Sequence, residues 1–166
     1  MSLLAFVVQT AALVVAVAGL LKAIDPAPVG RALHAAGLPS HPVVGRALGA
    51  VEVGVGAWVL VGGGRLAAAA LAALYAGFLA FIASNRLRGL SVPCGCLGET
   101  TRPPGPAHWV IDGIGVSAAL VAVWSPVGPA TEWLDDGLVG LLALAGVVAA
   151  AAAAVVAMDR VGRHQR

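Results

Sequence analysis

The 166-residue sequence contains few charged and few aromatic residues. Charged side chains make up 11% of the chain and aromatic side chains 5%. Charged residues make up about a quarter of a typical soluble globular domain, so this composition excludes that class. Hydrophobic residues make up 60%, and the mean hydropathy is +0.94. The composition therefore predicts an integral membrane protein whose surface faces the lipid bilayer.

Cysteine and methionine are also scarce, with two of each. Two cysteines exclude a disulfide scaffold, which needs several bridges. The absence of methionine-rich or further cysteine motifs from the apolar segments argues against a soft-metal transport path. The net charge is +2, and no basic stripe alternates with aromatic residues, which argues against nucleic acid as a partner. We expect no cofactor.

Five apolar segments are long enough to cross about 30 Å of hydrocarbon as helices. We expect the first to be a permanent span rather than a signal peptide, because Met1 to Leu4 carries no positive charge and the apolar run continues to Leu21. The sequence thus predicts an all-α polytopic membrane bundle that forms one domain, 1–166. The expected spans are about 3–21, 43–61, 66–84, 107–124 and 137–158.

Two spans carry patterned helix faces. In the second span, spacings of four, three and four residues place four positions on one face that can approach a neighbouring helix closely. These positions are Gly45, Gly49, Glu52 and Gly56. In the third span, the residues Tyr75, Phe78, Ile82 and Asn85 also share one face.

Both cysteines lie in the connector 85–106, within the stretch Val92-Pro93-Cys94-Gly95-Cys96-Leu97-Gly98-Glu99. Two thiols separated by one glycine can form a strained, readily reduced disulfide or bind one soft metal ion. Pro93 disfavours helix on its N-terminal side, and Gly95 and Gly98 permit the backbone angles that bring the sulfurs together. The pattern favours a reactive cysteine turn; the alternative is two incidental small residues in a connector.

A few polar residues interrupt the spans. A carboxylate within the hydrocarbon is costly unless it is paired, so Glu52 is a candidate functional residue. We predict that Lys22 pairs with Glu52, and that this pair and Asp112 form a polar recess under the cysteine connector, which holds a thiolate or relays its proton. The alternative is a salt bridge that only fixes packing, with Asp112 favoured by the helix dipole. We interpret His34 and His41 as solvated.

The basic residues indicate an orientation. Nine of them fall on one side of the alternating spans, and only Arg65 falls on the other. By the positive-inside rule, the N-terminus is outside, whereas the C-terminus and the cysteine connector are cytoplasmic. The nine are Lys22, Arg31, Arg46, Arg86, Arg88, Arg102, Arg160, Arg163 and Arg166.

The order of these features resembles MauE, a family of methylamine-utilisation membrane proteins within the wider DoxX-like group of four-helix membrane proteins. The resemblance covers the first four spans and rests on Gly19-Leu20-Leu21-Lys22 with Asp25, on Glu52, and on Cys94-Gly95-Cys96-Leu97-Gly98. Leu97 stands where the family usually has Phe, and a fifth span follows the four-helix core. The resemblance implies a redox-associated protein, linked in methylamine-using bacteria to maturation or export of the disulfide-rich small subunit of methylamine dehydrogenase.

The predicted function is thiol-disulfide exchange, and the protein is a candidate oxidoreductase. One cysteine, as thiolate, attacks the disulfide of a thioredoxin-like or other thiol partner, and the other resolves the mixed disulfide. We assign the attack to Cys94 because Pro93 precedes it, and the opposite order, with Cys96 as attacker, is the alternative. Because disulfides of exported proteins form outside, a cytoplasmic connector either lies in a recess accessible from both sides or serves a cytoplasmic thiol carrier. The alternatives are binding or transfer of a soft metal such as Cu(I) by Cys94 and Cys96, and a non-catalytic assembly role.

Overall fold

A computed structural model describes residues 2–92 and 104–161, with side chains as far as Met158. Over these ranges the chain is helical and contains no strand, and five helical segments are long and apolar enough to cross a membrane. The predicted all-α bundle of five spanning helices is thereby confirmed. The helices are α1 (Leu3–Ile24), α2 (Ala27–Ala35), α3 (Pro42–Val61), α4 (Gly64–Leu87), α5 (Pro106–Trp124), the short 3-10 helix η1 (Ala130–Asp136) and α6 (Gly137–Val161).

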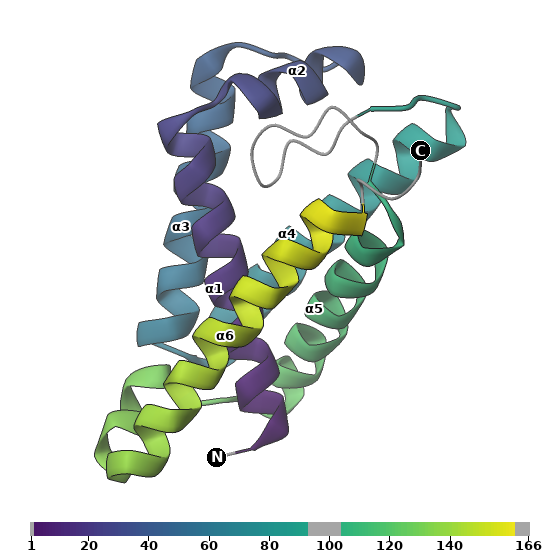
Figure 1. Cartoon of the computed structure of the whole chain (residues 1–166). Helices are drawn as coiled ribbons and strands as arrows, with labels where there is room; N and C mark the ends of the chain where they lie inside the picture. Colours follow the sequence, from purple (N-terminus) through teal and green to yellow (C-terminus); the bar gives the residue numbers. More distant parts are fainter. Residues whose placement is uncertain (1, 93–103, 162–166) are drawn as a thin grey trace.

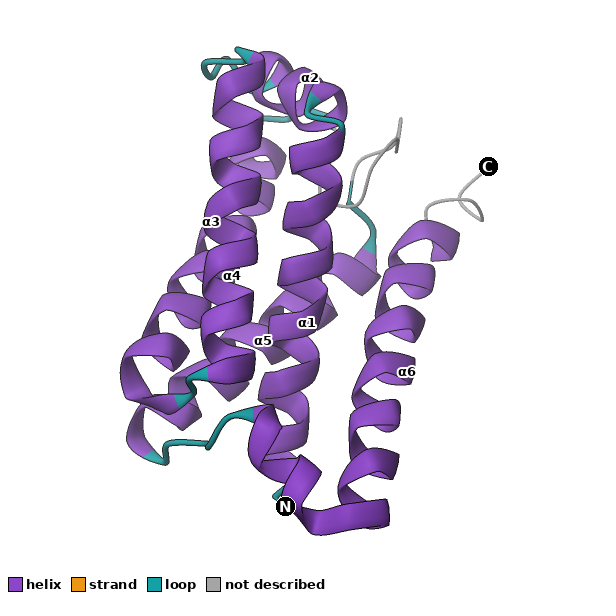
Figure 2. Ribbon diagram, turned by 90° about the vertical axis from the view of Figure 1, so that its left-hand side faces the viewer, coloured by secondary structure: helices purple, strands orange, loops and turns teal. Residues whose placement is uncertain are grey.

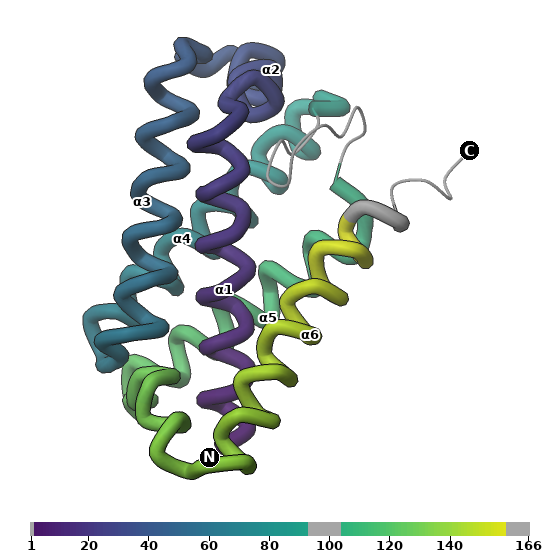
Figure 3. The backbone as a smooth tube through the Cα atoms, turned by 60° about the vertical axis from the view of Figure 1, so that its left-hand side comes forward, coloured from purple at the N-terminus to yellow at the C-terminus, as the bar shows by residue number. Residues whose placement is uncertain are grey.

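The long helices alternate in direction, so the chain enters the bundle at one end and leaves it at the other (Figure 1). α1 and α3 run side by side, α2 lies across their ends, and α4 packs against α5 (Figure 3). We call the end that carries α2 the α2 end. The helices α4 and α5 are joined there, so the segment 88–105 connects them at this end.

α1 and α3 approach closely because glycines lie at their interface. The buried residues of α3 are the predicted face together with Val59. A Cβ atom added at Gly49 would lie 2.6 Å from the backbone oxygen of Gly19, and one added at Gly56 would lie 2.6 Å from that of Ala12. Neither position has room for a side chain, which confirms that this face makes a close helix-to-helix approach.

The helix α2 lies between the first two predicted spans, 3–21 and 43–61, where the sequence indicated no helix. Its residues Pro28, Val29 and Ala32 are buried, so one side of this short helix packs on the bundle. The Arg88 guanidinium donates a hydrogen bond to the backbone oxygen of Ala36 at 3.1 Å and so links the end of α4 to the end of α2. The histidines of this region are exposed, as expected, and His41 also caps α3 by accepting a hydrogen bond from the Val43 amide.

The helix α6 lies at the edge of the bundle, beside α1 (Figure 2). Its buried residues include Val147 and Ala151, and Phe6 of α1 lies next to Gly146. Most of its surface is exposed. Of the 18 consecutive residues with the highest hydropathy in Ala130–Met158, 17% are buried, whereas the corresponding share for α1 is 50%. Exposed apolar side chains are appropriate for a helix that faces lipid.

Candidate functional site

The central polar contact of the bundle is an ion pair between α1 and α3. The Lys22 ammonium lies 2.7 Å from Oε2 of Glu52, and the two side chains are 3% and 0% exposed. Lys22 lies in the last turn of α1, and Glu52 lies one turn from Gly49 on the buried face of α3. The close approach at Gly19 and Gly49 brings the two side chains within reach, so the helix packing and the ion pair support each other.

Glu52 uses only part of its hydrogen-bonding capacity. Its second oxygen, Oε1, is buried and has no hydrogen-bond partner. The Lys22 ammonium lies 5.8 Å from the centroid of the Phe78 ring, a distance at which a cation interacts favourably with an aromatic face. The pair is therefore held from α1, α3 and α4, and one carboxylate oxygen is left as an acceptor.

Asp112 brings a second carboxyl group to this region. It is buried on α5, 6% exposed, and lies within electrostatic range of Lys22. The structure therefore brings together three polar residues singled out in the sequence: Lys22 and Glu52 in direct contact, and Asp112 within electrostatic range of Lys22. That these three support thiol chemistry stays a prediction.

Tyr75 joins the same region from α4, although the sequence indicated only its helix face and no role. Its hydroxyl donates a hydrogen bond to the backbone oxygen of Ala11 at 3.0 Å, and the carboxyl groups of Asp112 and Glu52 lie within electrostatic range of it. A Cβ atom added at Gly115 would lie 2.7 Å from the Tyr75 ring, so the ring can pack here only because Gly115 has no side chain. Tyr75 thus ties α4 to both α1 and α5.

Two further buried polar side chains lie near the ends of α4 and α5 that the segment 88–105 joins. Asn85 is 4% exposed and neither its amide nitrogen nor its amide oxygen has a hydrogen-bond partner. His108 is 9% exposed, and its Nδ1 also has no partner. Sequence reasoning missed His108, because a histidine at the start of an apolar segment is ordinarily at the membrane surface. His108 lies four residues before Asp112, so the two side chains share one helix face, and this spacing was the signal that could have indicated its burial.

The cysteines themselves lie outside the described residues. The segment predicted to form the reactive turn contains Pro93, Cys94, Gly95, Cys96 and Gly98. It lies between Val92 and Pro104, in the range 93–103 that the structure does not describe. The turn geometry and the proximity of the two sulfurs therefore stay predictions. Among the side chains that the structure describes, no group of three or more His, Cys, Asp or Glu residues could hold a metal ion.

The comparisons with known proteins give one finding. The family model described as methylamine utilisation protein MauE matches residues 1–126. The match includes α1 to α5 and both cysteines, and it leaves η1 and α6 outside. No curated protein and no solved structure matches the chain. Because the match spans well over half of the sequence, the chain belongs to the MauE family, as a multi-pass membrane protein.

Proposed function

We propose that this MauE-family protein exchanges thiols and disulfides through Cys94 and Cys96 in support of the maturation of a partner protein. The observation that carries the proposal is the buried Lys22–Glu52 ion pair with Asp112 in electrostatic range of Lys22. Asp112 lies on α5, one of the two helices that the cysteine segment joins, and Lys22 and Glu52 lie on the neighbouring helices α1 and α3. A thiol must lose its proton before it reacts. Glu52 Oε1, which has no partner, and Asp112 offer carboxyl groups that can take up that proton.

The exchange proceeds in two balanced steps. The Cys94 thiolate attacks one sulfur of a partner disulfide, which forms a mixed disulfide and releases the other partner sulfur as a thiolate. The Cys96 thiolate then attacks Cys94, which releases the partner as a dithiol and leaves a Cys94–Cys96 disulfide. The partner loses its disulfide and this protein gains one; the reverse sequence of steps oxidises the partner.

We further propose that the α2 end faces the cytoplasm. Lys22, Arg31, Arg46, Arg86 and Arg88 all belong to segments that meet at this end, and Arg65 begins α4 at the opposite end. Positively charged residues are retained on the cytoplasmic side. The C-terminus then lies in the cytoplasm and the N-terminus outside, and the direct partner is a thioredoxin-like carrier on the cytoplasmic side.

Trapping of the mixed disulfide tests the chemistry. Cys96→Ser removes the resolving thiol, so we expect a covalent adduct with a thiol partner that appears on a non-reducing gel and disappears on reduction. Cys94→Ser traps the adduct instead if the two cysteines act in the opposite order. The matched control is the double variant Cys94→Ser with Cys96→Ser, which cannot form an adduct. If neither single variant forms a thiol-dependent adduct in cells, the exchange mechanism is wrong.

Labelling of intact cells tests the orientation. A membrane-impermeant maleimide should leave Cys94 and Cys96 unlabelled until the membrane is permeabilised, and labelling should then require prior reduction if the pair is oxidised. A cysteine introduced at Ser2, in a variant that lacks the native pair, should be labelled from outside. Labelling of the native pair without permeabilisation would place these cysteines on the outer side and exclude a cytoplasmic carrier as the direct partner.

A further inference from the structure

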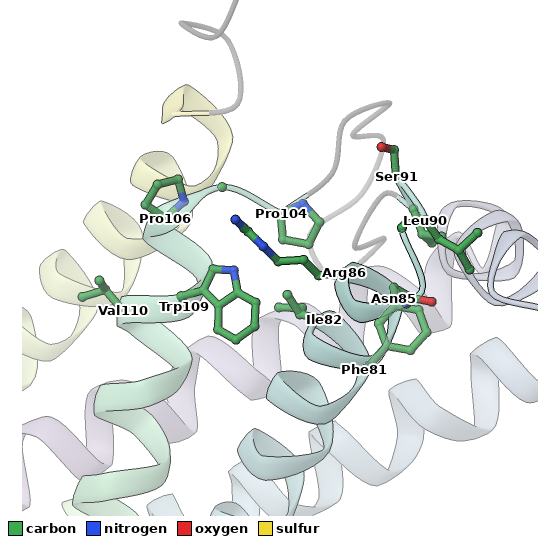
Figure 4. Close-up of a pocket in the computed structure, with 13 residues that line it drawn as sticks. Phe81, Ile82, Asn85, Arg86, Leu90, Ser91, Pro104, Pro106, Trp109 and Val110 are labelled. Atoms are coloured by element: carbon green, nitrogen blue, oxygen red, sulfur yellow. The ribbon is translucent and has the colours of Figure 1, made fainter.

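A second polar site lies at the α2 end, apart from the ion pair. A cavity of about 900 Å³ opens between the C-terminal end of α4 and the N-terminal end of α5 (Figure 4). Its described lining includes Asn85 and Arg86 from α4, and Pro106 and Trp109 from α5. Lys22, Glu52, Tyr75 and Asp112 are not among the lining residues, so the cavity does not belong to the ion-pair cluster.

Positive charge and hydrogen-bond donors converge on this cavity. Figure 4 shows the Arg86 guanidinium extended into the space between Pro104 and Trp109, with the indole nitrogen of Trp109 on the same side. Within the described residues, Arg86 takes part in no ion pair. The 19-residue helix α5 also begins here, and its N-terminal end carries a partial positive charge. Pro106 has no amide hydrogen and the His108 amide donates to the Gly105 oxygen at 3.1 Å, so the helix contributes this partial charge rather than a set of free amide donors.

Asn85 supplies an independent observation. Its side chain is 96% buried, it lines the cavity, and both of its amide atoms lack a hydrogen-bond partner. Buried polar groups in folded proteins are almost always hydrogen-bonded, and an amide that is not requires an explanation. A ligand that accepts a hydrogen bond from Nδ2 satisfies the donor side of this amide.

We propose that this cavity binds a phosphate group at the membrane surface. The forked donors of Arg86 match phosphate oxygens in geometry and charge. The partial positive charge at the N-terminus of α5 favours the same anion, and the Asn85 amide adds a second donor side chain. The apolar residues Phe81, Ile82 and Val110 line the cavity too, and they suit the glycerol and first acyl carbons of an anionic phospholipid. The phosphate chemistry is shared by a phospholipid headgroup and free inorganic phosphate.

Native mass spectrometry of the delipidated full-length protein in neutral detergent tests the site. We expect titration with phosphatidylglycerol to yield one saturable complex, and Arg86→Gln to weaken it by about tenfold, the effect of losing one charge-assisted hydrogen bond. The matched control is Arg46→Gln, which removes an exposed arginine at the same end that does not line the cavity. This control should bind within about twofold of the wild type, because it disturbs only the general charge of the surface. Equal weakening by the two variants would overturn the proposal.

Asn85→Leu separates binding from folding. The substitution removes an amide that has no partner, so the thermal unfolding temperature should not fall, whereas the affinity for phosphatidylglycerol should fall severalfold. A lower unfolding temperature with unchanged affinity would show a purely structural amide and contradict the proposal.

Inorganic phosphate distinguishes the source of the ligand. If millimolar phosphate displaces phosphatidylglycerol from the wild type but not from Arg86→Gln, the phosphate site is supported, whether its ligand is the lipid or the free anion. Saturable binding of phosphate in the absence of the lipid would identify the free anion as a ligand. If neither probe binds saturably, the site does not exist. The inference does not depend on the thiol chemistry, because no cysteine contributes to the site as proposed. The double variant Cys94→Ala with Cys96→Ala should therefore bind phosphatidylglycerol like the wild type, although it loses all exchange activity.

Discussion

The α1–α3 pair and helix α6 are both apolar and both long enough to span the membrane, yet they are joined to the bundle in different ways. α1 and α3 meet through glycines and enclose an ion pair with side chains 3% and 0% exposed. α6 has no charged residue from Gly137 to Met158, and most of its surface is exposed. Within lipid, apolar composition does not drive helices together, so close backbone packing and polar contacts decide which helices associate firmly. The family match ends before α6.

The largest effect should follow from removing one member of the ion pair. Glu52→Ala leaves the Lys22 ammonium in its buried position without this carboxylate, and a broken buried pair typically costs 3–5 kcal/mol. We expect about 3 kcal/mol or more of destabilisation, measured by denaturant unfolding in detergent micelles. The double variant Lys22→Met with Glu52→Leu should recover most of this loss, since it removes both charges. Equal losses in the single and double variants would show that the pair contributes no coupling.

A smaller effect should follow from filling the space between the helices. Gly49→Ala places a Cβ atom 2.6 Å from the Gly19 backbone oxygen, so α1 and α3 must separate. Overpacking of this kind costs about 1–3 kcal/mol. Gly54→Ala is the matched control, because a Cβ atom there meets nothing within 4 Å and alanine is the better helix former. If both substitutions change the free energy of unfolding equally, the two backbones do not pack as closely as described.

The smallest effect should come from the contact of α6. Val147→Ala removes two methyl groups from a side chain that is 3% exposed, and we expect about 1 kcal/mol of destabilisation. Val148→Ala, at a position that is 59% exposed, should change the stability little. Thiol exchange should be retained in both variants. A loss from Val147→Ala as large as that from Glu52→Ala would remove the distinction between the two regions.

The sequence predicted the features that depend on one helix at a time. The number of spans followed from hydropathy, and the buried face of α3 followed from the spacing of its glycines and Glu52, because helical periodicity is a local property. The helix α2 was missed because its apolar residues Pro28, Val29 and Ala32 lie in a short segment rich in breakers and polar residues.

Features that depend on several helices at once could not be predicted in the same way. The hydroxyl of Tyr75 reaches α1 and its ring packs on α5, and no spacing within α4 indicates either contact. The burial of Asn85 and His108 without full hydrogen bonding arises from the placement of neighbouring helices, which local pattern does not contain. For the close approach of α1 and α3, the spacing of the α3 glycines indicated the contact face but not which helix packs on it.

The tight crossing at Gly19 and Gly49 also limits how the two helices can move. Backbones this close leave no space for α1 to turn or slide against α3 unless the two helices first separate. Any rearrangement of the bundle that keeps the Lys22–Glu52 pair intact must therefore carry α1 and α3 together, as one rigid body.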